Sequence, residues 1–263
     1  NTIAALYKIG LENPESEFPL KKNLEENNPD FYPSGNILCW TQKISGNSEG
    51  KYRCYLGASH GIAGILQAML GISYLYNIYY KKGVNFNSNS NDIDPIGDKN
   101  IFTQAENKHK LGKNMILCSI DTTAKYILEN YRFKSGNLKN SVHTTEDRGR
   151  INWANGLTGW INLLLQLDWR EQAIEFGRFI YEYGLKKNLG QAEGITGNAY
   201  CFLELYKITE DIVWLNAAKV FACFGLYHYD EIVDSMVEGQ KEDSLMSGAG
   251  GFVYLLMDLI YPW

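Results

Sequence analysis

The sequence predicts an all-α protein built from stacked helical repeats, and two observations carry that prediction. The first is a short phrase, Gly-x-x-Gly, which opens an apolar helical stretch and recurs along the chain. The second is the scarcity of proline after residue 95, where only Pro262 follows. Because proline breaks long helices, its scarcity favours them. A recurring unit indicates supersecondary elements that bury their apolar faces against one another. The four copies, which we call the glycine starts, begin at Gly61, Gly156, Gly194 and Gly248.

The predicted helices follow from the spacing of apolar residues. Residues 62–80 predict a buried helix, and residues 114–132 predict an amphipathic one with apolar positions on one side. From residue 150 onward, a glycine-started apolar helix alternates with a more polar amphipathic helix. We expect these helices at 157–168, 170–186, 197–208, 211–227 and 249–261.

Three segments interrupt this pattern. The first 55 residues are irregular and carry four prolines in acidic and Asn-rich sequence. Residues 83–112 are Asn-rich and residues 134–149 are polar, so both are predicted as inserted surface loops. The chain over 1–263 is otherwise predicted as a single domain.

Composition excludes several classes of function. The net charge of −5 gives no bulk attraction for nucleic acid or an anionic membrane. The five cysteines are scattered and odd in number, which favours a reducing compartment over a disulfide framework. No uninterrupted apolar run reaches transmembrane length. The expected location is the cytoplasm, with the periphery of a membrane as the alternative.

The residues just before each glycine start are the candidates for catalytic and ligand-binding roles. Glycine ahead of a helix lets neighbouring backbone approach closely and leaves the first helical N–H groups accessible. We therefore expect four helix N-termini gathered around one cavity. An ordinary structural role is open to each residue there, because a histidine at a helix start is commonly structural and an acidic residue complements the helix dipole. The pairs concerned are Ser59-His60, Ala154-Asn155, Ala192-Glu193 and Met246-Ser247.

These motifs resemble a known family, the lanthionine synthetase C-like (LanC-like) proteins, which are relatives of the lantibiotic cyclases. Residues 55–65 resemble its Gly-Ala-x-His-Gly-x-x-Gly-Ile phrase, and residues 152–159 resemble its Trp-Cys-His-Gly-x-Pro-Gly motif. Residues 190–200 resemble Gly-Leu-Cys-His-Gly-x-x-Gly-Asn-Ala-Tyr, and residues 243–259 resemble the last repeat. The resemblance runs from about residue 36 to the end and is nearer to the eukaryotic branch, because Lys186-Lys187 precedes the third motif. It implies an α/α toroid, of which the four glycine starts represent four of about seven repeats.

The resemblance also implies which residues would hold zinc, and here the sequence departs from the family. Active members bind zinc through the cysteine of the second motif and the Cys-His pair of the third. Those positions are Ala154, Ala192 and Glu193 in this chain. Zinc catalysis requires three protein ligands and an open position, and alanine offers no donor atom. We therefore predict no zinc and no other cofactor.

The resulting hypothesis is a zinc-less pseudoenzyme, a non-catalytic scaffold of this family that binds glutathione or a peptide. The residues expected to line the ligand site are Lys187, Trp153, Asn155 and Glu193, with His60 beside them. In the family, the residue matching His60 is proposed to transfer a proton. His60 is therefore the one candidate catalytic residue.

Two alternatives remain open at this stage. One is a metal-free enzyme, carbohydrate-active or adding thiols, that uses His60 and Glu193 as an acid/base pair. Other α/α toroids include glycosidases, which use carboxylic acids in a central cavity. The other alternative is a protein-interaction module without a small ligand.

Overall fold

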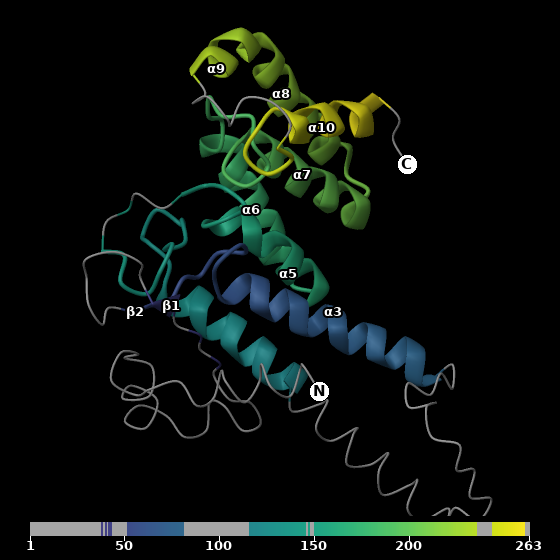
Figure 1. Cartoon of the computed structure of the whole chain (residues 1–263). Helices are drawn as coiled ribbons and strands as arrows, with labels where there is room; N and C mark the ends of the chain where they lie inside the picture. Colours follow the sequence, from purple (N-terminus) through teal and green to yellow (C-terminus); the bar gives the residue numbers. More distant parts are fainter. Residues whose placement is uncertain are drawn as a thin grey trace, which may run out of the picture. The chain divides into compact units, whose positions relative to one another are not determined.

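The computed structural model describes residues 38, 40, 42–43, 52–81, 116–145, 147, 150–235 and 244–260 (Figure 1). The expected Asn-rich insertion over 83–112 lies outside the described residues, as does most of the irregular beginning of the chain. The chain divides into two compact units. One comprises Asn1–Cys39 with Ala68–Tyr126, and the other comprises Trp40–Gln67 with Ile127–Trp263. The division falls inside helix α3 (Ile62–Lys81).

Apart from Leu38, the described part of the first unit is helical. It contains the later turns of α3 and the first turns of a helix over residues 116–130, which matches the helix predicted at 114–132. Leu38 is fully buried, and its N–H donates a hydrogen bond of 2.9 Å to Thr123 Oγ1. The Thr123 hydroxyl in turn donates to the carbonyl oxygen of Ser119 at 2.6 Å. Ile120 and Ala124 are also fully buried, as the amphipathic pattern predicts.

The second unit holds all four glycine starts. Its two short strands, β1 (Gln42–Lys43) and β2 (Tyr52–Arg53), pair antiparallel with Gln42 opposite Arg53. Its helices are a 3-10 turn, η1 (Leu157–Trp160), followed by α5 (Ile161–Gln166), α6 (Arg170–Tyr183), α7 (Ile195–Thr209), α8 (Ile212–Tyr227), α9 (Tyr229–Ser235) and α10 (Gly250–Ile260). The predicted helices from residue 150 onward are therefore present, and α9 is additional.

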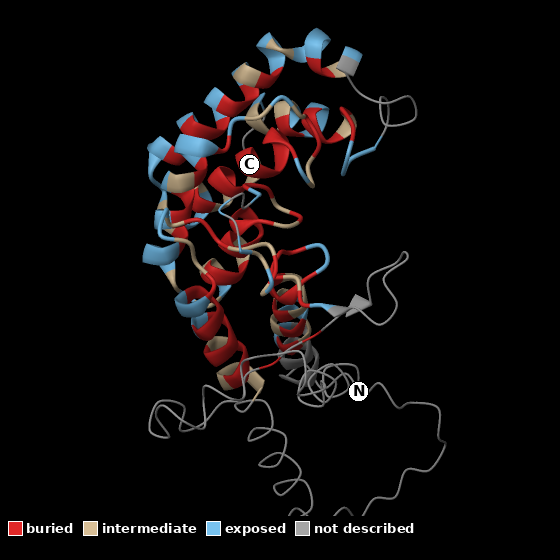
Figure 2. Cartoon of the chain, turned by 90° about the vertical axis from the view of Figure 1, so that its left-hand side faces the viewer, coloured by how far each residue is buried: buried red, intermediate tan, exposed pale blue. Residues whose placement is uncertain are grey.

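These helices pack in two layers. The glycine-started helices lie side by side, because α7 contacts both α5 and α10. The amphipathic helices cover them, since α6 packs on α5 and α7 and α8 packs on α7 and α10. In α6 the buried residues recur at helical spacing: Ala173, Phe176, Gly177 and Ile180. Figure 2 shows buried residues concentrated where the helices face one another.

Local chemistry sets the tight turn between α7 and α8. Helix α7 ends at Thr209 and is followed by Glu210, whose φ of 57° is left-handed. Asp211 then caps α8, because its Oδ1 accepts a hydrogen bond of 3.0 Å from the Val213 N–H. This turn lets α8 fold back along α7, where Phe202 stacks on Trp214 with ring centroids 6.0 Å apart.

The prediction of a surface loop at 134–149 is wrong for its first half. Asn137, Leu138 and Ser141 are buried. The segment pairs with the entry to the first glycine start, since the Leu56 N–H donates to the Asn140 carbonyl at 2.8 Å and the Val142 N–H donates to the Cys54 carbonyl at 3.1 Å. Polar composition misled the prediction because these backbone contacts do not depend on apolar side chains.

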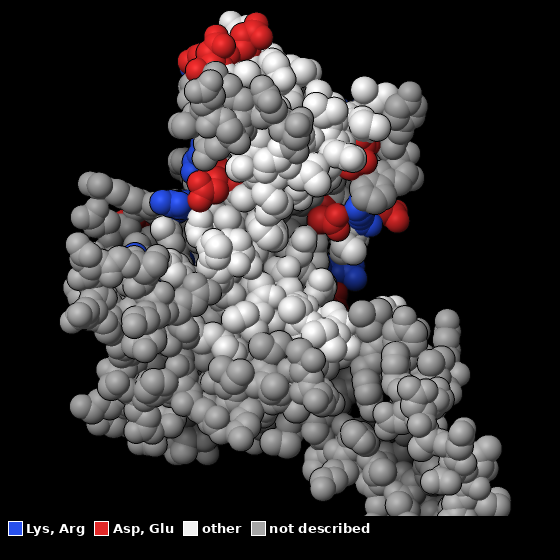
Figure 3. All heavy atoms as spheres, in the orientation of Figure 1, with Lys and Arg blue, Asp and Glu red and all other residues white. Residues whose placement is uncertain are grey.

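Acidic side chains gather over α9, which carries Asp230 and Glu231 in its first turn (Figure 3). In the portion of the chain that the structure describes, no helix combines the length and the apolar character needed to cross a bilayer.

Candidate functional site

The loops that precede the four glycine starts are joined by a ladder of backbone hydrogen bonds. Each bond joins the residue two places before a first glycine to its counterpart in the next repeat. The Ser59 N–H donates to the Ala154 carbonyl at 3.0 Å, and the Ala154 N–H donates to the Ala192 carbonyl at 2.8 Å. The Ala192 N–H then donates to the Met246 carbonyl, also at 2.8 Å. The loops before the four starts therefore lie next to one another in the second unit.

Close backbone approach explains the glycines. A Cβ on the second glycine of each start would collide with the carbonyl oxygen of the residue six places earlier. That distance would be 2.3 Å at Gly159, 2.0 Å at Gly197 and 2.3 Å at Gly251, and shorter still at Gly64. Only glycine fits such an approach without a backbone shift. The repeats thus share one loop geometry, and the glycines are required by it.

The same geometry corrects one expectation about the helix N-termini. The Ile62 N–H donates to the Tyr55 carbonyl at 2.9 Å, and the Ile195 N–H donates to the Asn188 carbonyl at 2.8 Å. These first helical donors are therefore occupied by each repeat's own loop. At these two starts, the first helical N–H is therefore not available to an anion.

A cluster of charged and polar side chains lies where the second and third repeats meet. Glu193 Oε1 accepts a hydrogen bond of 3.0 Å from Arg150 Nη1 and another of 3.0 Å from Asn155 Nδ2. Arg150 and Glu193 are each about half exposed, at 55% and 50% of their side chains. The structure therefore brings together two predicted site residues, Asn155 and Glu193, and adds Arg150, which the sequence analysis did not single out.

Lys186 belongs to this cluster and Lys187 does not. Burial lowers the pKa of the Lys186 ammonium, the Arg150 guanidinium lowers it further, and Glu193 acts in the opposite direction. The Lys187 ammonium instead lies 2.6 and 2.8 Å from the two carboxylate oxygens of Glu231 in α9. The sequence predicted Lys187 as the site residue. It is Lys186, however, whose pKa is influenced by the charges of Arg150 and Glu193.

His60 and Trp153 lie on the loops that the ladder joins. His60 is exposed, so it is not a packed core residue, and it follows Ser59, whose Oγ also donates to the Ala154 carbonyl at 3.1 Å. Trp153 is half-buried, and its Cβ would lie 3.2 Å from a Cβ added at Gly197 in the third repeat. Trp160 is fully buried and donates its indole N–H to the Leu56 carbonyl at 2.9 Å.

The donor set at the positions of the family's zinc ligands does not fit a zinc ion. Ala154 and Ala192 offer no side-chain donor, and the carboxylate of Glu193 is already bonded to Arg150 and Asn155. The nearby Cys201 is buried, donates its thiol to the Thr158 carbonyl at 3.2 Å, and has a pKa that burial raises. Within the described residues, no group of three His, Cys, Asp or Glu side chains is placed to hold a metal.

Beneath the cluster, a buried amide joins the second repeat to the third. Asn198 in α7 is fully buried and accepts a hydrogen bond of 2.9 Å from the Thr158 hydroxyl. Its Nδ2 donates to the Gly184 carbonyl at 2.9 Å and to the Ile151 carbonyl at 3.3 Å. This network fixes the segments on which Arg150 and Lys186 are carried.

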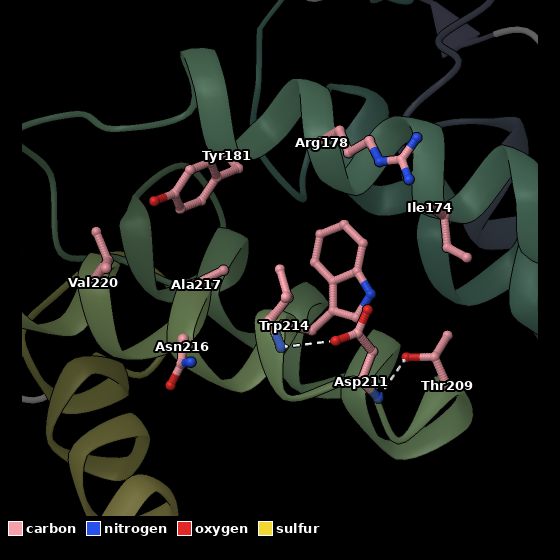
Figure 4. A pocket seen from close by; sticks show the side chains of 10 residues that line it. Ile174, Arg178, Tyr181, Thr209, Asp211, Trp214, Asn216, Ala217 and Val220 are labelled. Atoms are coloured by element: carbon pink, nitrogen blue, oxygen red, sulfur yellow. Dashed lines mark hydrogen bonds between the residues drawn. The ribbon is translucent and has the colours of Figure 1, made fainter.

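A separate groove of 470 Å³ lies between α6 and α8. Figure 4 shows Tyr181 and Arg178 of α6 on one side and Trp214, Ala217 and Val220 of α8 on the other. The groove contains none of the predicted site residues. Its Asp211 carboxylate is engaged as the cap of α8, where it accepts the hydrogen bond from the Val213 N–H.

Comparison with known proteins identifies the family. The model of the family described as "Lanthionine synthetase C-like protein" matches residues 102–263. The chain is 36% identical over 152 residues to LanC-like protein GCL1 of Arabidopsis thaliana, which covers 54% of this chain and 35% of that protein. It is 28% identical over 244 residues to Glutathione S-transferase LANCL1 of Danio rerio, covering 87% of this chain and 50% of that protein.

A solved structure confirms the fold class. Nisin cyclase, an α/α toroid, matches with a TM-score of 0.53 and 14% identity over 81% of this chain and 48% of that one. The chain therefore spans half or less of the length of these three proteins. The predicted all-α toroid class is confirmed, and the chain belongs to the lanthionine synthetase C-like protein family.

Proposed function

We propose that this chain is a zinc-less LanC-like protein that binds glutathione, or a short peptide of similar charge, without catalysing the addition of its thiol. The observation that carries the proposal is the Arg150–Glu193–Asn155 network at the position of a family zinc ligand. A carboxylate bonded to a guanidinium and an amide is a structural arrangement, whereas catalysis by zinc requires three free donors and an open position.

The side chains of the cluster support an anionic ligand. Arg150 and Lys186 supply two positive charges and Glu193 one negative charge, so the three together favour one added carboxylate. Glutathione carries two carboxylates, and one of the matched relatives is named a glutathione S-transferase. Trp153 and Asn155 complete the proposed lining. We assign the second cationic contact to Lys186, because the Lys187 ammonium is held by Glu231.

The proposed absence of catalysis follows from the chemistry of the cysteine thiol of glutathione. An ordinary cysteine thiol has a pKa of about 8.5 and is mostly protonated at neutral pH. Without a metal to stabilise the thiolate, the nucleophile stays weak. We also propose a cytoplasmic location, which suits the free thiols of Cys54, Cys118, Cys201 and Cys223.

The experiment is a titration with glutathione by calorimetry, after the metal content of the protein has been measured. We expect binding without stoichiometric zinc, and weaker binding in Arg150→Gln and Lys186→Gln. Lys187→Gln is the matched control and should bind as the parent does. Stoichiometric zinc, or equal affinity in all four proteins, would contradict the proposal.

The same titration separates the carbohydrate-active alternative. A glycosidase needs two carboxyl groups across a cavity, whereas Glu193 contacts a cation and an amide. Titration with oligosaccharides in place of glutathione should therefore give no heat. Saturable binding of a sugar that His60→Ala abolishes would favour the metal-free enzyme instead.

A further inference from the structure

The groove between α6 and α8 has a floor of packed aromatic side chains. Trp214 is 5% exposed, and its ring stacks on that of Phe202 with centroids 6.0 Å apart. A Cβ added at Gly177 of α6 would lie 2.8 and 2.9 Å from Cη2 and Cζ3 of Trp214, so the indole lies directly against α6. Phe202 also contacts Phe221 edge to face, with centroids 5.0 Å apart. The hollow of 470 Å³ above this floor is therefore formed by tightly packed residues before any ligand enters.

One end of the groove is apolar. Tyr181 of α6 lines it together with Ala217 and Val220 of α8 (Figure 4). The ring centroid of Tyr181 lies 6.4 Å from that of Phe221, which places this end one turn beyond the contact of Trp214 with α6. Tyr181 and Val220 are 49% and 43% exposed, so a ligand lying between them would remove apolar surface from water.

The other end carries two opposite charges that are not paired with each other. Arg178 of α6 and Asp211 at the start of α8 both line the groove, and both are exposed. Figure 4 shows them toward the end opposite Tyr181 and Val220. Within the described residues, the Arg178 guanidinium makes no hydrogen bond or ion pair. Asp211 Oδ1 accepts from the Val213 N–H, whereas its Oδ2 has no partner in that part of the chain.

A third polar group faces the same end of the groove. The indole nitrogen of Trp214 is directed toward the end that holds Asp211 (Figure 4). Its N–H makes no hydrogen bond to any residue that the structure describes, although the side chain is almost fully buried. An indole N–H that is buried usually has an acceptor, because a buried donor without one is costly. A carbonyl oxygen on a ligand would supply that acceptor.

We propose that this groove binds a dipeptide that has free termini and apolar side chains. The Asp211 carboxylate accepts from the ammonium group of the dipeptide, and the Arg178 guanidinium donates to its carboxylate. The Trp214 N–H donates to the peptide carbonyl between them, and the apolar side chains lie along Tyr181 and Val220. A ligand with one charge would satisfy only one of the two charged walls, which is why the groove favours a ligand that carries both.

The proposed site is separate from that of the proposed function. The groove is lined by none of the residues of the network that joins Arg150, Glu193 and Asn155. Binding of a dipeptide here therefore does not depend on binding of glutathione there, and each can be measured without the other.

The test uses leucyl-leucine as the probe and ligand-observed NMR to measure its dissociation constant. We expect saturable binding to the parent at neutral pH, where both termini are charged. N-acetyl-leucyl-leucine lacks the ammonium group and leucyl-leucine amide lacks the carboxylate, so each should bind several-fold more weakly. Glycyl-glycine keeps both charges but has no apolar side chain, and it should not bind measurably.

Two variants assign each terminus to its contact. Arg178→Gln should weaken leucyl-leucine and its N-acetyl form several-fold and leave the amide unchanged. Asp211→Asn should weaken leucyl-leucine and its amide and leave the N-acetyl form unchanged, and asparagine still caps α8. Lys219→Gln is the matched control, because it removes an exposed cation of α8 that does not line the groove.

Chemical protection locates the bound dipeptide directly. Phenylglyoxal modifies accessible arginines, and peptide mass spectrometry measures the modified fraction of each. Leucyl-leucine should slow modification of Arg178 several-fold. Modification of Arg170, which is also exposed in α6 but is bonded to Asp168, should be unchanged.

Several results would overturn the proposal. They are no saturable binding of leucyl-leucine to the parent, equal binding of glycyl-glycine, and unchanged affinity in both Arg178→Gln and Asp211→Asn. An equal loss in Lys219→Gln would also overturn it, and circular dichroism establishes that each variant is folded. Arg150→Gln should leave leucyl-leucine binding unchanged. Absent glutathione binding with retained leucyl-leucine binding would remove only the proposed function, and the reverse would remove only this proposal.

Discussion

The backbone N–H of Ala154 donates a hydrogen bond of 2.8 Å to the carbonyl oxygen of Ala192. These are two of the positions at which the family motifs carry zinc ligands. The backbone that would bring two ligating side chains together is therefore present, although neither side chain has a donor atom. The geometry of the glycine starts is thus separable from the chemistry that the same loops can support, as is general for folds and the sites built on them.

The second glycines of the starts should be intolerant of any side chain. In Gly197→Ala, the new Cβ would lie 2.0 Å from the carbonyl oxygen of Gln191, so the loop or α7 must shift. We expect a loss of about 1–3 kcal/mol in the free energy of unfolding, as for other overpacked sites. Urea titration followed by circular dichroism measures it.

Gly71→Ala is the matched control, because a Cβ added there would have nothing within 4 Å and the residue is exposed in α3. Alanine there should stabilise the helix by about 0.5–1 kcal/mol. Equal effects of the two substitutions would show that the glycines are kept for backbone freedom in general and not for the close approach at the starts.

Asn198 should be the most sensitive polar residue of the second unit. Its side chain is fully buried and bonded to Thr158, Gly184 and Ile151. Asn198→Ala leaves a hydroxyl and two carbonyls without their partner, at a cost of about 1–3 kcal/mol. Thr158→Val removes one of these bonds and should cost less. Thermal unfolding of both variants decides the order, and a smaller effect for Asn198→Ala than for Thr158→Val would contradict the assignment.

The fold was more predictable than the site, for a physical reason. Glycine positions and the spacing of apolar residues are both read directly from the sequence, so the repeats from Gly156 onward appear where the sequence places them. The site depends on which long side chain reaches a neighbouring repeat. Arg150 lies six residues before Gly156, where its carbonyl oxygen would meet a Cβ added at that glycine, and no sequence pattern indicates that its side chain reaches Glu193 in the next repeat.

The choice between Lys186 and Lys187 could not be made from the sequence. Both are lysines after the same helix, and only the position of Glu231 in α9 distinguishes them. Helix α9 (Tyr229–Ser235) was not predicted, because the expected helix over 211–227 ends before it and its seven residues are too few to show a helical repeat of apolar positions.

Cys201 and Cys223 should differ sharply in reactivity. Cys201 is buried and its pKa is raised by that burial, so its thiolate is scarce at neutral pH. Cys223 is exposed on α8. A maleimide reagent should therefore modify Cys223 at once and Cys201 only after unfolding, which mass spectrometry of the peptides can follow. Rapid modification of Cys201 in the native protein would mean that α7 opens readily from α5.

The pairing of Lys187 with Glu231 should give a small dependence of stability on pH. The hydrogen bond from Lys187 and then that with His228 lower the pKa of the Glu231 carboxyl. A lowered folded pKa contributes stability above the unfolded value, about 4.3, and that contribution is lost as pH falls through the folded value. The difference in melting temperature between the parent and Glu231→Gln should therefore shrink in acid. A difference that grows in acid would contradict the pairing.

The vacant zinc positions can be tested by restoring their ligands. Ala154→Cys, Ala192→Cys and Glu193→His together supply the donor set that the family motifs carry, on loops already joined by the Ala154–Ala192 backbone bond. Loss of Glu193 also releases Arg150 from its ion pair, and this positive charge would oppose metal binding. We expect the triple variant to bind zinc when purified with the metal, and to bind it more tightly when Arg150→Gln is added. The parent should contain none. Elemental analysis of the parent and the two variants measures this. A folded triple variant that stays metal-free with or without Arg150 would mean that the residues supporting the ligands have been lost as well.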